Sequence, residues 1–244
     1  MELVRRRRSL VLWAVFPISI LLLNGFILAE ANRSTVGEAF GLAAPTTLTG
    51  TALFFSAVGG TVATLVAERE SQSLVRLLLS PLSGVSYFLG ILLAYGIVGL
   101  GQALLVGAIA GALGATYVGS WGLGLLVLAL AEAGYVGLGF WLGAQFARRV
   151  EDVNGLVAGV GVPLLILSGS FFPVSVLSDD LLLLAQFNPI FHLNRAFLAI
   201  AVDGSSWRDR VLQEDLVYSA GFTLIMLGAA WVSYRRLLRV ERRL

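Results

Sequence analysis

The sequence contains neither cysteine nor lysine in 244 residues, and its single histidine is His192. Without cysteine the chain has no disulfide, no thiolate metal site and no cysteine nucleophile. Without lysine it has no Schiff base and no Walker A motif, because the phosphate-binding GxxxxGK[ST] loop needs that side chain. One histidine cannot form the paired-histidine zinc site of a membrane metalloprotease. We therefore expect no metal site in this chain and no catalytic activity of its own.

Charged residues are also scarce, at 13% of the sequence against roughly 25% in a soluble domain. Hydrophobic residues make up 57%, and the mean hydropathy is +0.86. The formal net charge of +2 is too small to indicate a nucleic-acid partner. The composition therefore predicts an integral membrane protein that contacts lipid.

Stretches without charge locate the membrane spans, because crossing a hydrocarbon core of about 30 Å takes roughly 20 apolar residues in a helix. The stretch between Arg76 and Glu132 is too long for one helix, and a turn near Tyr117–Trp121 divides it. The first apolar run is long for a signal peptide, so it counts as a retained helix. The prediction is an all-α integral membrane protein with residues 1–244 in one transmembrane domain. Its six spans are expected at about 10–29, 45–66, 86–114, 121–147, 153–172 and 216–234.

Arginines are distributed unevenly among the segments that connect these spans. If the N-terminus is cytoplasmic, 13 of the 17 arginines lie on the cytoplasmic side, as the positive-inside rule requires. An even number of spans then places both termini in the cytoplasm. The heavy use of alanine, glycine, leucine, valine and arginine without lysine is typical of a GC-rich prokaryotic coding sequence, so we expect a prokaryotic cell membrane.

One further apolar segment, 181–200, is too short and too interrupted to count as a span. Only 14 uncharged residues separate Asp180 from Arg195, and Asn188–Pro189 breaks them in the middle. Short, broken apolar segments are typical of re-entrant or interfacial helices. We therefore predict an outer re-entrant helical hairpin at about 173–200, before the last span.

Glu132 is the ionisable residue predicted to lie inside a span, near its middle. A comparable residue at a helix centre costs roughly 2.5–3.5 kcal/mol to insert, so it needs a partner, a wet cavity or a proton. Two interpretations stay open. Glu132 is either a proton or cation site on a transport path, or a protonated carboxyl hydrogen-bonded to a neighbouring helix, with Gln102 or Asn24 as candidate partners.

The segment after the second predicted span has the pattern of a short amphipathic helix. Leu74 and Leu77 share one helical face. The acidic pair Glu68 and Glu70 suits a helix start, and a proline ends the helix near residue 80. The pattern predicts a helix over about 67–82 along the inner membrane surface, which serves either as an interfacial anchor or as a docking surface for a partner.

Two blocks of residues carry a resemblance to a known family. The first comprises Glu68-Arg69-Glu70, Leu74, Arg76-Leu77-Leu78 and Ser80-Pro81-Leu82-Ser83, and the second comprises Leu167-Ser168-Gly169-Ser170-Phe171-Phe172-Pro173, then Asn188-Pro189 and Arg195. In order and spacing they resemble the cytoplasmic coupling segment, and the fifth span with the outer hairpin, of ABC transporter permeases of the type-2 membrane-subunit family. The six-span topology is also the topology of that family.

The resemblance implies the membrane-spanning half of an exporter, in which two permease chains form a homo- or heterodimer with two copies of a P-loop ATP-binding subunit. That subunit would hold ATP and magnesium, in agreement with the absence of lysine from this chain. The implied ATPase-docking residues in the coupling helix are Glu68, Arg69, Glu70, Leu74, Arg76, Leu77, Ser80 and Pro81. The implied residues of the outer gate are Phe171, Phe172, Pro173, Asn188, Pro189 and Arg195.

The substrate and one competing function are judged from the polar residues of the spans. These spans are rich in glycine, alanine and leucine, which favours a hydrophobic or amphipathic substrate. The alternative function is a stand-alone secondary transporter or channel that uses Glu132. Such proteins typically have paired broken helices and several intramembrane polar groups, and this sequence has one carboxylate without a matched pair of breaks.

Overall fold

The structure is a computed structural model that describes residues 7–71 and 84–241. These residues contain helices and no strand, and six of the helices are long and apolar enough to cross a membrane. This confirms the prediction of an all-α membrane protein with six spans. The long helices are α2 (Arg7–Asn32), a continuous helix over Val36–Glu70, α6 (Gly84–Ala112), α7 (Trp121–Gln145), α8 (Val150–Leu167) and α11 (Arg210–Glu241).

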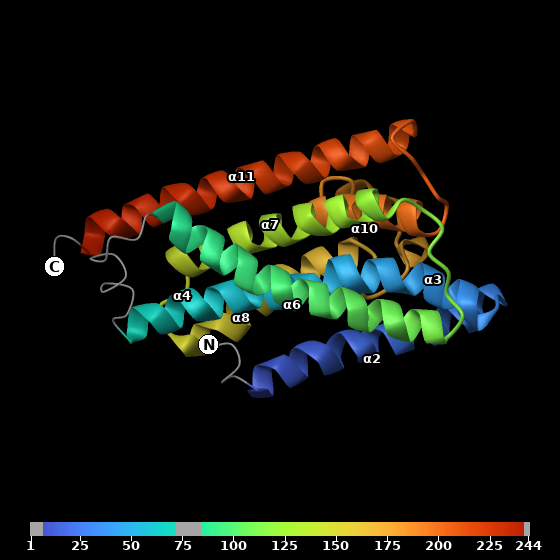
Figure 1. The fold of residues 1–244 in the computed structure, drawn as a ribbon, viewed down its shortest axis with the longest axis horizontal. Coiled ribbons are helices and arrows are strands. Elements are labelled where there is room, and N and C mark those ends of the chain that lie inside the picture. The colour runs from blue at the N-terminus through green and yellow to red at the C-terminus, as the bar shows by residue number, and fades with distance from the viewer. Residues whose placement is uncertain (1–6, 72–83, 242–244) are drawn as a thin grey trace.

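The long helices lie side by side along one axis, with α7 inside the bundle and α11 along one of its faces (Figure 1). The second and fourth spans are mostly buried, whereas most residues of the other four spans are half-buried or exposed. Large aromatic rings fill the centre, where Phe54 of the second span meets Tyr135 of α7 at a ring-centroid distance of 5.4 Å. The second span and α7 therefore form the core around which the other helices pack.

The second span is longer than the predicted 45–66, because it begins at Val36 and ends at Glu70. The predicted start is too late because Glu38 is treated as a loop residue on account of its charge. In the structure the Glu38 carboxylate accepts a hydrogen bond from the Thr35 backbone and completes a capping box, so this charge lies in the first turn of the helix. Within this span, α3 (Val36–Thr46) passes into two π-helical segments, η1 (Thr47–Ala52) and η2 (Phe54–Gly59), before α4 (Gly60–Glu70). Segments of this kind are rare and often mark functional sites.

The two ends of the bundle differ. One end is here called the Arg69 end. At this end α4, α7 and α11 finish, and α2 and α8 begin (Figure 1). At the other, here called the Asn188 end, α8 is followed by the short 3-10 turn η3 (Val174–Val176), α9 (Asp179–Ala185) and α10 (Pro189–Ala201). With 7 and 13 residues, α9 and α10 are too short to span a membrane. The re-entrant position of this hairpin in the membrane stays a prediction.

Candidate functional site

Arg69 caps the end of a different helix from its own. From the last turn of α4, its Nη1 donates to the Ala147 carbonyl at 3.1 Å and to the Gly143 carbonyl at 3.5 Å, and its Nη2 donates to the Ala144 carbonyl at 3.5 Å. These carbonyls lie at the C-terminus of α7, where the last turn lacks backbone partners and the helix dipole favours a cation. Arg69 therefore fixes the end of α4 to the end of α7.

The acidic residues on either side of Arg69 reach two further helices. The Glu70 carboxylate accepts a hydrogen bond of 3.1 Å from the Val150 amide at the start of α8, a position where the helix dipole favours an anion. The Glu68 carboxylate accepts a hydrogen bond from the Tyr87 hydroxyl of α6, and the Tyr87 ring stacks on Tyr234 of α11. We call residues 68–70 the clasp, because they join the end of α4 to α6, α7 and α8.

The clasp corrects one prediction. The prediction that Glu68 and Glu70 start a separate helix over 67–82 is wrong about this start: both residues lie in the last turn of α4, which ends at Glu70 with Ser71 as its C-cap. An acidic side chain does lie at a helix start, but the helix is α8 and is 80 residues away in sequence. The remaining predicted docking residues lie outside the described residues: Leu74, Arg76, Leu77, Ser80 and Pro81.

At the Asn188 end, a buried amide holds four segments together. The Asn194 amide of α10 donates to the Ser168 carbonyl at 2.9 Å and to the Ser170 hydroxyl at 2.8 Å, and its oxygen accepts from the Thr49 hydroxyl of η1 at 2.6 Å. Asn24 of α2 donates to the Ser170 carbonyl at 3.2 Å. We call these five residues the Asn194 junction; it joins α2, the second span, the end of α8 and α10.

The predicted gate residues lie around this junction. Asn188 caps α10 by accepting from the Ile190 amide, and it donates to the Leu164 carbonyl of α8 at 2.6 Å. Pro189 occupies the first turn of α10. Phe171, Phe172 and Pro173 follow α8, with Phe172 exposed and the Phe171 ring 6.4 Å from Phe16 of α2.

Arg195 is paired with a residue that the sequence analysis did not single out. Its guanidinium donates to both carboxylate oxygens of Asp215 in α11, at 2.7 Å and 2.6 Å. His192 stacks on Tyr218 and places its Nδ1 2.7 Å from Asp215 Oδ1. His192 and Asp215 are both buried, and the hydrogen bonds to Asp215 raise the pKa of Arg195 above its usual value. The prediction that the last span begins at residue 216 leaves Asp215 in a loop, whereas α11 begins at Arg210 and includes it.

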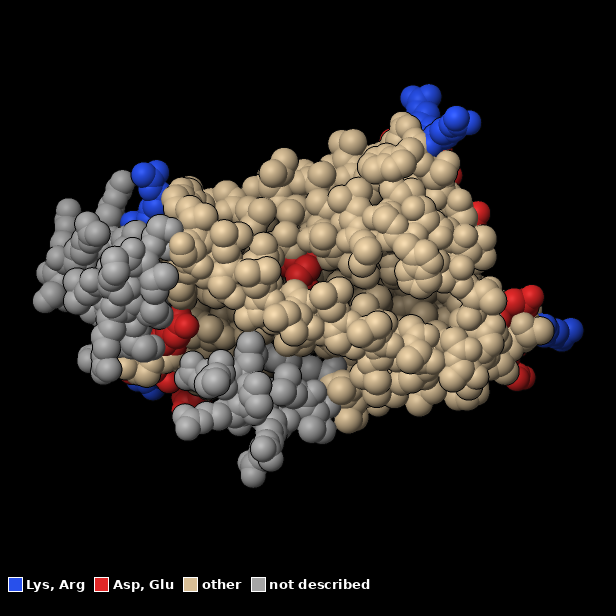
Figure 2. All heavy atoms as spheres, in the orientation of Figure 1, with Lys and Arg blue, Asp and Glu red and all other residues tan. Residues whose placement is uncertain are grey.

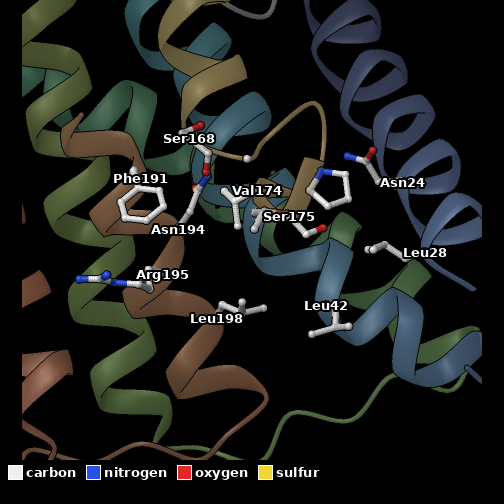
Figure 3. A pocket seen from close by; sticks show the side chains of 13 residues that line it. Asn24, Leu28, Leu42, Ser168, Val174, Ser175, Phe191, Asn194, Arg195 and Leu198 are labelled. Atoms are coloured by element: carbon white, nitrogen blue, oxygen red, sulfur yellow. The ribbon is translucent and has the colours of Figure 1, made fainter. Parts of the chain in front are cut away.

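A cavity of about 260 Å³ lies between this hairpin and the first two spans (Figure 3). Asn24 and Leu28 of α2, Leu42 of α3 and Leu198 of α10 reach it, and Asn194 points toward Ser168 at its rim. Pro173 and Arg195 also line it, but the Arg195 guanidinium points away from the cavity, toward Asp215. The mouth of the cavity is therefore shaped by hairpin residues, with few charges directed inward.

The interior position predicted for Glu132 is observed, but its predicted hydrogen-bond partners are not. Glu132 lies in the middle of α7 and is 7% exposed. Asn24 is bonded to the Ser170 carbonyl instead, and Gln102 accepts from the Ser56 hydroxyl at 3.0 Å. Among the residues that the structure describes, neither carboxylate oxygen of Glu132 has a hydrogen-bond partner.

Comparison with known proteins gives one match. A family model described as "ABC-2 family transporter protein" matches residues 11–232, which include all six spans except the ends of the first and last. No curated protein matches the chain.

Proposed function

Since this chain belongs to the ABC-2 family of transporter proteins, we propose that it is the membrane-spanning permease subunit of an ATP-binding-cassette exporter. Membership implies an ABC ATP-binding subunit as partner, and the membrane subunits of this family are generally not catalytic. In our proposal two such partners bind and hydrolyse ATP with magnesium, and two permease chains form the pathway for a hydrophobic or amphipathic substrate. The chain lies in a prokaryotic cell membrane with both termini in the cytoplasm.

The observation that carries this proposal is the clasp. Three consecutive charged side chains at the end of one span hold the ends of three others, through the hydrogen bonds of Glu68, Arg69 and Glu70. A partner that moves this point displaces α6, α7 and α8 together, because packed helices move as rigid bodies and not by bending. A membrane subunit driven by a separate motor needs such a shared attachment.

The same helix that Glu70 holds at one end meets the hairpin at the other. The Leu164 carbonyl near the end of α8 accepts the hydrogen bond of Asn188, and the Asn194 amide holds the backbone just after it at Ser168. A shift of α8 along its axis therefore reaches the hairpin directly. We assign the opening and closing of the outer side to this connection.

The test is to purify the chain with the ATP-binding subunit encoded beside it and to measure substrate-stimulated ATP hydrolysis and ATP-driven transport in lipid vesicles. We expect Arg69→Ala to weaken association and coupling, because α4 is then released from α7. Arg235→Ala is the matched control, since this exposed arginine lies near the finish of the last span, at the same end. Unchanged association and transport in Arg69→Ala would contradict the proposal.

A stand-alone secondary transporter is the second candidate function, and the unpartnered carboxylate of Glu132 is the observation that favours it. Transport by the purified chain alone, driven by an ion gradient and without nucleotide, would support this candidate and contradict the exporter.

A further inference from the structure

Glu132 faces a cavity between two helices that pack loosely. This cavity of about 460 Å³ is lined by leucine, isoleucine and alanine side chains and by the glycines of α6 and α7, by Leu53 of the second span, and by Glu132. Small ligands commonly occupy cavities of about 300–1,000 Å³. Figure 2 shows a small acidic patch in a hollow near the middle of this face, away from the other charged atoms, which lie toward its two ends. Glu132 is the acidic residue in the part of the lining that the structure describes.

Two glycines on α6 leave room for the cavity and for the Glu132 carboxylate. A Cβ atom at Gly96 would meet nothing within 4 Å, which marks open space beside the helix. A Cβ atom at Gly99 would lie 2.8 Å from Oε2 of Glu132, so the carboxylate occupies the room that the absent side chain leaves. The side chain of Glu132 is therefore directed across the gap toward α6.

The cavity continues toward the Asn188 end. A neighbouring cavity of about 490 Å³ shares four of its lining residues, Leu100, Ala103, Leu125 and Leu128. The second cavity ends at Tyr117 and Trp121, whose rings stack with centroids 4.3 Å apart. Aromatic faces attract cations, so a route with aromatic rings at one end and a carboxylate at the other suits a positively charged apolar molecule.

We propose that this cavity binds a lipophilic cation, an apolar molecule with one ammonium- or phosphonium-type charge, and that the Glu132 carboxylate is its counter-ion. A carboxyl group in an apolar, water-poor place is stable when it holds a proton or lies beside a cation. The lining that the structure describes includes no arginine and no histidine, so a cation that pairs with the ionised carboxylate here comes from the ligand. The assignment of this molecule as the transported substrate rests on the proposed function above.

A neutral lipid chain or a second copy of this chain fits less well. A lipid chain would fill the apolar space but leave the carboxylate as it is, with neither oxygen hydrogen-bonded. If a second copy packed here through the same face, its cavity lining would bring no arginine or histidine to pair with Glu132. Charge complementarity thus favours the lipophilic cation.

The test measures binding of tetraphenylphosphonium to the purified chain in phosphatidylcholine nanodiscs, without nucleotide and without an ATP-binding subunit. Tetraphenylborate, which has nearly the same shape and the opposite charge, is the ligand control. We expect Glu132→Gln to lower the affinity for tetraphenylphosphonium by about tenfold or more, which corresponds to 1.4 kcal/mol, and to leave or improve that for tetraphenylborate. Equal affinity of wild type and Glu132→Gln for tetraphenylphosphonium would overturn the proposal.

A second pair of variants tests the cavity while the carboxylate is unchanged. Gly96→Leu fills the cavity and is expected to abolish most tetraphenylphosphonium binding. Gly228→Leu adds the same bulk on α11, where a Cβ atom also meets nothing within 4 Å, and is expected to bind as the wild type does. Binding by Gly96→Leu equal to that of Gly228→Leu would overturn the proposal.

Two further outcomes separate this inference from the proposed function. Because the chain has no cysteine, Ile97→Cys at an exposed position of the lining reports on occupancy by another copy. An efficient disulfide between two copies of this variant would overturn the cation site. If tetraphenylphosphonium binds as expected but its transport does not depend on an ATP-binding subunit, the site is supported and the proposed exporter fails.

Discussion

Asn188 donates a hydrogen bond of 2.6 Å to the Leu164 carbonyl, and this bond joins the start of α10 to the last turn of α8. The same carbonyl accepts from the Ser168 amide at 2.9 Å, so the end of α8 and the hairpin share one acceptor. At its other end α8 is held by Glu70. This helix therefore connects the clasp to the hairpin without an intermediate.

We predict that Asn188→Ser separates the hairpin from α8 without unfolding α10. Serine is also a good N-cap, so the start of α10 is preserved, but its short side chain does not reach Leu164. Loss of one hydrogen bond lowers the stability by about 1 kcal/mol, and substrate stimulation of the ATP-binding subunit should fall while basal hydrolysis is retained. ATPase assays on the vesicle-reconstituted complex check this; full stimulation would show that α8 does not drive the hairpin.

Arg195 and Arg210 provide a matched pair for the contribution of ion pairs on α11. Arg195→Ala leaves the buried Asp215 carboxylate with His192 as its remaining side-chain partner. Because the Arg195 side chain is 40% exposed, we expect a loss of about 1–2 kcal/mol, less than the roughly 3–5 kcal/mol of a fully buried pair. Arg210→Ala removes an exposed pair with Glu214 at 3.5 Å and should change the stability by less than about 0.5 kcal/mol. Thermal unfolding of both variants in detergent measures the difference; equal melting temperatures would show that the Arg195–Asp215 pair is not structural.

Local patterns predicted the elements better than the contacts between them. The number of spans follows from charge-free stretches, and the interruption between α9 and α10 from Asn188–Pro189, a signal confined to two residues that the structure shows to be the N-cap and first residue of α10. The Asn194 junction could not be predicted, because Thr49 and Asn194 are 145 residues apart and meet only through packing. The contacts of the clasp could not be predicted for the same reason. Local rules favour Glu70 at the start of a helix, but the fold determines which helix starts beside it.

The two π-helical segments likewise have no signature in the sequence. They place buried hydroxyls at Thr49 and Ser56, which the composition of the spans did not suggest. Both hydroxyls bond back to carbonyls of their own helix and also to an amide oxygen of another helix, Asn194 or Gln102. The polar contacts of the core were thus underestimated from the sequence.

Gly50 is predicted to be the most sensitive glycine of the second span. A Cβ atom there would lie 1.8 Å from Oγ and 2.5 Å from Cβ of Ser170, so Gly50→Ala should push the end of α8 away and reduce the yield of folded protein. Gly41→Ala on the same span, where nothing lies within 4 Å, is the control and should fold normally. Size-exclusion profiles of fluorescent fusions report both. The double variant Gly50→Ala/Ser170→Gly should recover part of the yield; no recovery would mean that the clash lies elsewhere.

Gly99→Ala is predicted to displace the Glu132 carboxylate without removing it. The added Cβ would lie 2.8 Å from Oε2 of Glu132 and 3.0 Å from Cδ2 of Leu53. Both atoms are the far ends of flexible side chains, so the fold should survive with a small loss of stability, while the carboxylate turns away from α6. Affinity for tetraphenylphosphonium should then fall by about threefold to tenfold, since a contact that is displaced but not removed loses less than about 1.4 kcal/mol.

The control for this prediction is Gly96→Ala, because a Cβ atom at Gly96 meets open space three residues away on the same helix. This variant removes little of the cavity and should bind tetraphenylphosphonium with nearly wild-type affinity. If Gly96→Ala and Gly99→Ala lose affinity equally, the effect comes from the volume of the cavity and not from the carboxylate. A loss of affinity in Gly99→Ala alone would show that binding depends on the position of the Glu132 carboxylate. A cavity that binds molecules only through apolar contacts would not show this dependence.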